Sequence, residues 1–401
     1  MKKYIKRVIV LLVIGMLYFL FKPIFVYNFG WEKLNNSNRE LAVEHTRNSF
    51  VKADSVLIKA LENIKAPGIS IAVGKNNVLL WENAIGYADI ESKKRIGIET
   101  RFRIGSVSKA LTSAGLGILL AQEKINLSTK VKDIFPNSYE KMTEVTVEQL
   151  ASHTSGIRNY GVCFSFPIWE YYNQKQFKTI REATGVFANS TLLFSPGSQY
   201  SYSTYNFTML SLLMEKKADQ KFLFFMEQQV FNPIGMKNTS EREEGDLATF
   251  YIVEKGAYKK AYSVNNSNKY AGGGYVSTPK DLVLYGNAIL NNTLLKEEVK
   301  NKLFTPVKLT NGELNNEGYA IGWRVGETTK IFKDQRKVEI VHHGGVAMGA
   351  TSFLLLLPEY NISAAISINA NTGKGRSQIV DTLYSVIAIL THDDKVHYEE
   401  L

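Results

Sequence analysis

Segments with β-strand patterns lie at the two ends of this chain, and segments with helical patterns lie between them. Residues 68–73 and 78–88 form an apolar hairpin pattern around a turn at 74–77. Strand patterns return only near the C-terminus, at 320–325, 337–341, 351–357 and 362–369, with a turn at 358–361 between the last two. The sequence therefore predicts one sheet built from distant segments, an α/β (α+β) protein in which helices flank an antiparallel sheet.

The middle of the chain predicts an inserted all-helical lobe. Residues 145–240 show mainly helical and loop patterns, punctuated by Pro167, Pro196 and Pro233. Residues 111–122 are too apolar for a surface helix, so we expect this helix to run through the core with its N-terminus facing a cleft. A final apolar helix is expected at 379–390.

The N-terminus predicts a membrane anchor or an export signal. Lys2, Lys3, Lys6 and Arg7 precede an uninterrupted apolar run at 8–21. An uncleaved anchor is favoured because no small-residue cleavage signature follows the run. The positive residues place the N-terminus in the cytoplasm and export everything after about residue 30. We expect the cell envelope, with the protein in the inner or cytoplasmic membrane and its main domain outside, in the bacterial periplasm or at the surface.

These patterns divide the chain into four parts. We expect an anchor or signal at 1–30, a helical juxtamembrane segment at 31–66, a single large domain at 67–391, and a polar tail at 392–401.

Charge and composition exclude several classes of function. The formal net charge is +10, of which residues 1–30 supply half, and no long basic block occurs elsewhere. Nucleic-acid binding is therefore not expected. Cys163 is the only cysteine, which excludes an internal disulfide and a cysteine-based metal cluster. The histidines follow no metal-binding pattern, so we expect neither a metal nor another cofactor.

Ser-x-x-Lys occurs twice in the chain. Ser106 and Lys109 stand at the start of the predicted core helix, where a spacing of three places both side chains on one face. A buried lysine that stays partly neutral can take the proton of a serine hydroxyl and make it a nucleophile. Ser277 and Lys280 show the same spacing, but Pro279 after Thr278 describes an ordinary helix start.

Five ordered segments resemble the signatures of class C beta-lactamase-type serine hydrolases and penicillin-binding proteins. They are Ser106-Val107-Ser108-Lys109, Ser152-His153-Thr154-Ser155-Gly156-Ile157, Pro196-Gly197 followed by Tyr202-Ser203-Thr204, Ala271-Gly272-Gly273-Gly274, and His342-His343-Gly344-Gly345. Their details are most similar to the mitochondrial beta-lactamase-like proteins and their bacterial relatives. The resemblance covers nearly all of the chain after residue 67 and implies a beta-lactamase/transpeptidase-like fold.

The resemblance also implies roles for individual residues. Tyr202 matches the tyrosine that relays protons, with Tyr205 as a fallback if the register slips. Thr204 stands where the family commonly has a substrate-binding asparagine. His342 is expected to point into the cleft, where an imidazole attracts a substrate carboxylate less firmly than lysine. Gly344 and Gly345 follow on the same strand, and the amides of Ser106 and Gly345 are expected to form the oxyanion hole.

Two further features have competing explanations. His153 suggests a Ser-His pair, but the resembling family uses this segment as a structural turn, so no chemistry is assigned to it. An aromatic cluster either walls the substrate pocket or forms the core of the helical lobe. Its members are Tyr160, Phe164, Phe166, Trp169, Tyr171 and Tyr172.

The function expected from the sequence is that of an exported serine hydrolase working through an acyl-enzyme. Its substrate is a small peptide, a D-peptide, an ester or a beta-lactam, with a peptide or ester favoured. The alternative is a non-catalytic or penicillin-binding envelope scaffold that retains the fold. The sequence does not indicate an oligomeric state.

Overall fold

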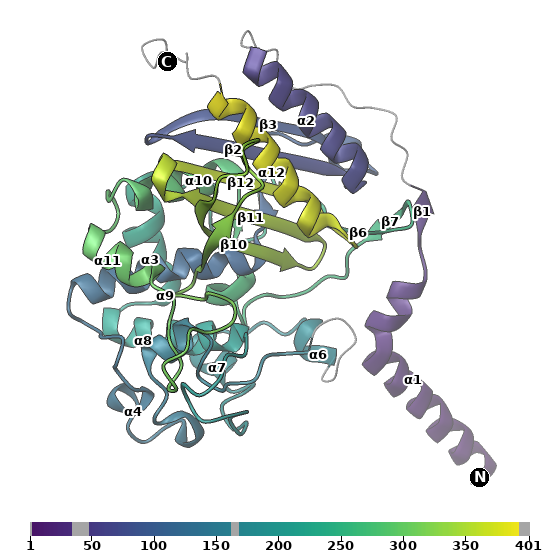
Figure 1. The fold of residues 1–401 in the computed structure, drawn as a ribbon. Coiled ribbons are helices and arrows are strands. Elements are labelled where there is room, and N and C mark those ends of the chain that lie inside the picture. The colour runs from purple at the N-terminus through teal and green to yellow at the C-terminus, as the bar shows by residue number, and fades with distance from the viewer. Residues whose placement is uncertain (1, 34–47, 162–167, 393–401) are drawn as a thin grey trace.

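The computed structural model describes residues 2–33, 48–161 and 168–392. Its centre is a seven-stranded sheet with the strand order β4-β3-β2-β12-β11-β10-β9, and every neighbouring pair is antiparallel (Figure 1). The hairpin near the N-terminus pairs directly with a C-terminal strand, since β2 lies beside β12. The strands are β2 (Gly68–Lys75), β3 (Val78–Asp89), β4 (Lys94–Arg95), β9 (Arg324–Thr328), β10 (Val338–Ala347), β11 (Ala350–Leu357) and β12 (Ile362–Ile368). The expected sheet of distant segments is confirmed.

Helices cover both faces of this sheet. On one face α2 (Asn48–Ile64) and α12 (Gly375–His392) pack against each other and bury an apolar cluster under them (Figure 1). On the other face α10 (Pro279–Leu290) lies across β2 and β12, and α3 (Ser108–Ala121) joins the larger core cluster. Eleven of the fourteen α3 residues are buried, which agrees with the predicted core helix. α11 (Glu297–Phe304) packs on the outer side of α3.

The helical lobe is inserted between these layers. Its longest helix, α8 (Thr204–Ala218), contacts α3 and several of the short helices. The short helices are α4 (Val131–Ile134), α5 (Val147–Ala151), α6 (Ile168–Tyr171), α7 (Ile180–Thr184) and α9 (Phe222–Met226). Many aromatic and apolar side chains of this lobe are completely buried, among them Phe187, Phe207 and Leu213.

A second, four-stranded sheet was not predicted from the sequence. Its order is β1-β7-β6-β13, formed by β1 (Glu32–Lys33), β7 (Ala257–Lys260), β6 (Tyr251–Glu254) and β13 (Ala370–Thr372). A further short pair joins β5 (Phe102–Arg103) to β8 (Val276–Ser277). These strands are two to four residues long, and such lengths leave little alternation to recognise.

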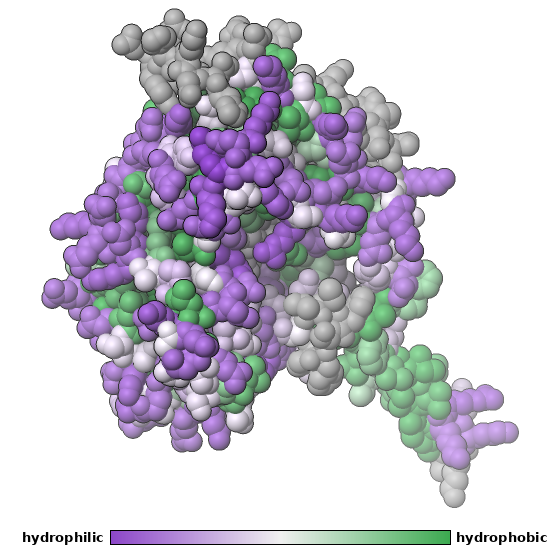
Figure 2. Space-filling view, viewed as in Figure 1, coloured by the Kyte–Doolittle hydropathy of each residue, from purple (hydrophilic) through white to green (hydrophobic). Residues whose placement is uncertain are grey.

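The N-terminal helix α1 (Lys2–Asn28) projects from the body, and its apolar side chains are largely exposed (Figures 1 and 2). Among the described residues it is the one helix long and apolar enough to cross a membrane, with a mean hydropathy of 2.5. Its end is attached to the β6–β7 hairpin: the Lys259 ammonium donates to the Phe29 carbonyl at 2.9 Å, and β1 pairs with β7. The juxtamembrane helix begins only at Asn48, and the expected stretch at 34–47 lies outside the described residues.

Candidate active site

Ser106 and Lys109 come together at the start of α3. Gly105 has a φ of +51°, a left-handed conformation suited to glycine, and begins a 3₁₀ turn (Gly105–Val107) that leads into the helix. The Ser108 hydroxyl donates to the Gly105 carbonyl at 2.7 Å and closes this turn. The Lys109 Nζ lies 3.1 Å from the Ser106 Oγ, so the two predicted residues are within hydrogen-bonding distance.

Lys109 is completely buried among neutral oxygen atoms. Besides Ser106, its Nζ contacts the Gly272 carbonyl at 2.5 Å and the Thr204 Oγ1 at 3.3 Å. Burial lowers the pKa of Lys109 well below its usual value, and the positive charges of Lys269 and Arg324 lower it further. A neutral amine has two N–H groups and one lone pair. With two oxygens accepting, the lone pair remains free to take the Ser106 proton.

Tyr202 lies against the same lysine. Its ring centroid is 4.7 Å from the Lys109 Nζ, and its hydroxyl lies close enough to Ser106 to interact with it. Burial raises the pKa of Tyr202 far above neutrality, although the contact with Ser106 opposes this shift. The phenol therefore keeps its proton in the resting protein and is a donor next to the Ser106 oxygen.

The structure places Thr204 differently from the sequence expectation. Its side chain is buried and its hydroxyl faces Lys109, so it orients the amine and is not exposed for substrate binding. Tyr205, the fallback for Tyr202, points away from Ser106. Its hydroxyl donates to the Glu170 carboxylate at 2.8 Å and its ring stacks on Phe187.

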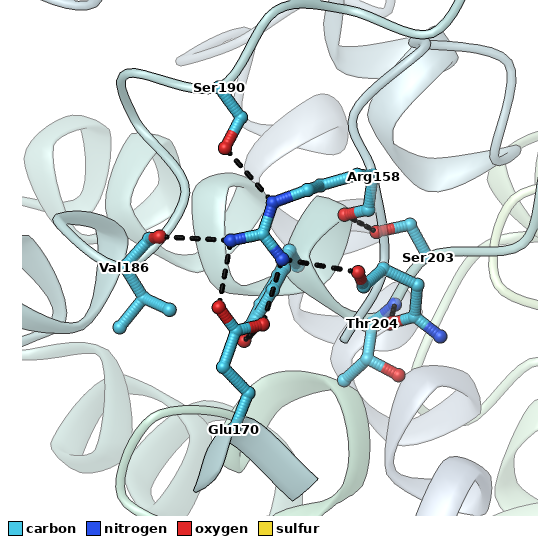
Figure 3. Close-up of polar contacts among 8 residues, drawn as sticks. Arg158, Glu170, Val186, Ser190, Ser203 and Thr204 are labelled. Atoms are coloured by element: carbon cyan, nitrogen blue, oxygen red, sulfur yellow. Dashed lines mark hydrogen bonds and ion pairs between the residues drawn. The ribbon is translucent and has the colours of Figure 1, made fainter. Parts of the chain in front are cut away.

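An ion pair holds the segment before α8 in place (Figure 3). The Arg158 guanidinium makes a bidentate pair with Glu170, at 2.7 and 2.8 Å, and also donates to the Ser190 hydroxyl and the Val186 carbonyl. The carbonyl of Arg158 accepts from the Ser203 hydroxyl at 2.8 Å. Because Ser203 lies between Tyr202 and Thr204, this buried cluster fixes both side chains at Lys109. No motif in the sequence indicates Glu170 as the partner of Arg158, because Glu170 lies outside the segments that carry the family resemblance.

The expectation that His342 faces the cleft is wrong, because the register of β10 turns that side chain to the other face. His342 stacks on Phe353 in the cluster under α12, with ring centroids 5.2 Å apart. Side chains alternate along a strand, so His343 shares a face with Val341, which packs in the cluster with α3.

His343 is the buried imidazole on the catalytic side. Its Nε2 lies 2.9 Å from the Tyr319 hydroxyl and its Nδ1 lies 2.8 Å from the Gly344 carbonyl. A carbonyl only accepts, so Nδ1 carries the proton and Nε2 accepts from Tyr319. Burial lowers the pKa of His343 well below its usual value, and the charge of Lys109 adds to this effect. The strand thus holds a neutral, buried imidazole against Tyr319 on the side of Lys109.

The same register changes the expected oxyanion donor. Ala347 and Ala350 flank a two-residue hairpin, so they form a hydrogen-bonded pair, and Gly345 with Ser352 forms the next such pair. The Gly345 N–H therefore faces β11. The Val346 N–H faces the opposite edge, where its nitrogen lies 2.8 Å from the position that a Cβ on Gly105 would take. Val346, not Gly345, presents its amide to the Ser106 segment.

The two glycines on β10 allow this close approach. A Cβ on Gly345 would lie 1.9 Å from the Ile104 carbonyl oxygen and 3.1 Å from the Ser106 nitrogen. The neighbouring Gly344 lies on the other face, against Arg376. Neither residue therefore offers a side chain to the site, and only the Gly344 amide faces the same edge of β10 as the Val346 amide.

His153 supports the site from behind. Its ring centroid is 4.2 Å from that of Tyr202, and its Nδ1 accepts from the Ser203 N–H at 3.3 Å. Its φ of +63° and complete burial fit the turn that the resemblance implied. The pKa of His153 is lowered by burial, so it is a neutral packing partner of Tyr202.

The remaining sequence candidates are separated in space. Ser277 is completely buried and its hydroxyl pairs with Thr239, while α10 begins at Pro279 with Thr278 as its cap. Of the aromatic cluster, Tyr160 and Tyr171 flank Lys269, Trp169 is exposed, and Phe164 and Phe166 lie outside the described residues. Cys163 also lies outside them. Within the described ranges, no group of three histidine, cysteine or acidic residues is arranged to hold a metal.

Comparison with known proteins gives the same picture as the geometry. Residues 53–388 match the family described as Beta-lactamase. The chain belongs to the beta-lactamase family. It is 30% identical to the mitochondrial serine beta-lactamase-like protein LACTB of Homo sapiens, over 76% of this chain and 71% of the relative. It is 26% identical to protein flp of Staphylococcus aureus, over 82% of this chain and 64% of that protein.

Solved structures of other proteins share the fold. A penicillin-binding protein homologue from Pyrococcus abyssi has a TM-score of 0.71 at 22% identity, covering 85% of this chain and 77% of the other. A D-amino acid amidase from Ochrobactrum anthropi has a TM-score of 0.71 at 18% identity, covering 85% and 99%. Family membership and the Ser106–Lys109 geometry together support a serine hydrolase.

Proposed function

We propose that this family member is an exported, membrane-anchored hydrolase that cleaves a peptide, a D-peptide or an ester through an acyl-enzyme on Ser106. The observation that carries the proposal is the 3.1 Å contact between the Ser106 Oγ and a completely buried Lys109. A buried lysine with a lowered pKa is the base that a serine nucleophile needs. The exposed apolar helix α1 supports the anchor.

The proposed reaction has two steps. Lys109 takes the Ser106 proton, the oxygen attacks the carbonyl carbon, and the amides of Ser106 and Val346 stabilise the oxyanion. Tyr202 donates its proton to the leaving nitrogen or oxygen and recovers one from Lys109. Water then attacks the acyl-enzyme by the reverse route and releases Ser106.

The choice among substrates rests on the strand position of His343. That position holds a neutral imidazole in place of a lysine, so the strand supplies less attraction for the carboxylate of a beta-lactam. A peptide or an ester is therefore favoured over a beta-lactam. Among proteins of similar fold, the D-amino acid amidase supports an amide or peptide with a D-residue as one class to test.

The test is covalent labelling with a fluorophosphonate, followed by peptide mass spectrometry. We expect an adduct on Ser106, no adduct in Ser106→Ala, and full labelling in Ser277→Ala, the matched serine of the second Ser-x-x-Lys segment. Turnover of p-nitrophenyl esters, D-peptides and nitrocefin then ranks the substrates. An adduct on another residue, or activity that survives in Ser106→Ala, would refute the mechanism and favour the scaffold alternative.

A further inference from the structure

Lys269 is a buried cation that no sequence motif singled out. It precedes the turn Tyr270–Gly274, and only 8% of the residue is exposed. Its ammonium lies over two aromatic rings, 4.7 Å from the centroid of Tyr160 and 5.9 Å from that of Tyr171. Such contacts stabilise a cation and offset part of the cost of removing it from water.

Within the described ranges, no carboxylate is paired with this ammonium. Glu170, which precedes Tyr171 on α6, is already held by Arg158 and Tyr205. Glu243, near the segment that leads to Lys269, is paired with Arg103. Residues 162–167 contain no acidic residue in the sequence. Among the residues that the structure describes, Lys269 therefore has no carboxylate as a counter-charge.

This cation lies beside the catalytic base. The Gly272 carbonyl that accepts from Lys109 belongs to the turn that Lys269 begins, and the amides of Gly272 and Gly273 donate to the Lys269 carbonyl at 3.1 and 2.9 Å. Of the two neighbouring charges that lower the pKa of Lys109, Lys269 has the larger effect and Arg324 the smaller. Arg324, the second cation of the cleft, already has Glu317 as its partner. Lys269 is therefore the charge left for a ligand.

We propose that Lys269 is an anion-binding residue of the substrate site, whose ammonium pairs with a carboxylate of the substrate while Ser106 attacks a neighbouring ester or amide. This inference rests on the proposed hydrolase function and narrows its substrates to those that carry a carboxylate near the scissile bond. The neutral imidazole of His343 does not supply this positive charge. In this proposal the carboxylate is bound by Lys269, next to Tyr160 and Tyr171.

The experiment compares matched anionic and neutral substrates on the full-length protein. One pair carries the charge on the acyl side: the 4-nitrophenyl monoester of glutaric acid against 4-nitrophenyl valerate. The other carries it on the leaving group: the acetate ester of 3-hydroxybenzoate against that of its methyl ester. The measured quantity is the ratio of kcat/KM, anionic over neutral, at a pH above the acidic limb of the reaction.

We expect Lys269→Met to lower this ratio about tenfold in at least one pair, mainly through KM, since a charged hydrogen bond is worth about 1.5–3 kcal/mol. Lys269→Arg keeps most of the preference because it keeps the charge. Lys141→Met, which removes an exposed lysine elsewhere, leaves both ratios unchanged. Equal ratios in wild type and Lys269→Met for both pairs would overturn the proposal.

A second readout does not depend on turnover. N-acetyl-D-alanine, a carboxylate product, should bind the Ser106→Ala protein in calorimetry and lose that binding when Lys269→Met is added. Fluorophosphonate labelling of Ser106 in Lys269→Met shows that the variant is folded. If the wild-type protein is not labelled, the hydrolase proposal is refuted independently of the anion site. Carboxylate binding that persists without Lys269 refutes the anion site in either case.

Discussion

At the scale of single residues, the site is organised around keeping Lys109 uncharged. Burial disfavours its ammonium form, and the charges of Lys269 and Arg324 add to that effect. The neighbours that could be charged are themselves held neutral: burial lowers the pKa of His343 and raises that of Tyr202. The reaction thus begins from a neutral amine, a phenol and a hydroxyl within a few ångströms of one another.

This arrangement predicts the pH dependence. The activity requires neutral Lys109. The value of kcat/KM is therefore maximal above the lowered pKa of Lys109 and falls as the pH drops through that pKa. Removing a neighbouring positive charge makes the ammonium form less costly and raises that pKa. Arg324→Gln should therefore move the acidic limb of the profile to higher pH, measured with a neutral ester.

Arg336→Gln is the matched control, because that arginine is about half exposed and pairs with Asp334 in the loop after β9. Its profile should coincide with that of wild type. An acidic limb that moves to lower pH in Arg324→Gln would contradict the assignment of Lys109 as the base.

Some of these residues could be predicted from the sequence, and others could not. Ser106, Lys109 and Tyr202 belong to short motifs with a fixed spacing, and the structure brings all three together. His343 and Val346 were missed because a one-residue change of register exchanges the faces of a strand, and a pair of adjacent histidines does not indicate which one points inward. Lys269 and Glu170 act through neighbours that are distant in the sequence, so no local pattern could reveal them.

At the scale of elements, the critical contact is between the N-terminal turn of α3 and β10. The backbone of β10 approaches Gly105 and Ser106 so closely that a Cβ on Gly345 would lie 1.9 Å from the Ile104 carbonyl oxygen. The strand and the helix start must keep this separation for the Val346 amide to reach the oxyanion. The element order that produces the contact was predictable, but the distance was not.

Gly345→Ala should therefore separate β10 from the Ser106 turn. We expect kcat to fall by about 10²–10³, as for the loss of one oxyanion donor, with a smaller change in KM. Steady-state kinetics on a p-nitrophenyl ester measure the loss. Gly326→Ala on the neighbouring β9 is the control, since a Cβ there has open space. Equal activity of the two variants would rule out the close approach as the cause.

At the scale of the whole molecule, the catalytic domain and α1 have separate tasks. The residues that contact Lys109 come from the turn that leads into α3, from α8 and from the turn at Tyr270–Gly274. The end of α1 contributes to a neighbouring pocket, where Pro23, Val26 and Tyr27 lie with Val346. The helix is attached at its end, where the Lys259 ammonium donates to the Phe29 carbonyl and lies over the Trp31 ring at 5.2 Å.

Removal of residues 2–33 should therefore yield a soluble protein with kcat unchanged within about twofold on soluble esters. The full-length protein should stay in the membrane fraction after an alkaline carbonate wash. Fractionation followed by activity measurement tests both statements. Full-length protein in the soluble fraction, or a truncated protein without activity, would show that α1 is not a separate anchor.

The pairing of β2 with β12 also has a consequence for biosynthesis. Ser106 and Lys109 leave the ribosome early, but the strand that carries Val346 and its neighbours β11 and β12 come from the last quarter of the chain. The first hairpin has no partner on that side until those strands are made. A nascent chain thus carries its nucleophile long before it can use it, and hydrolytic activity can begin only after translation is almost complete.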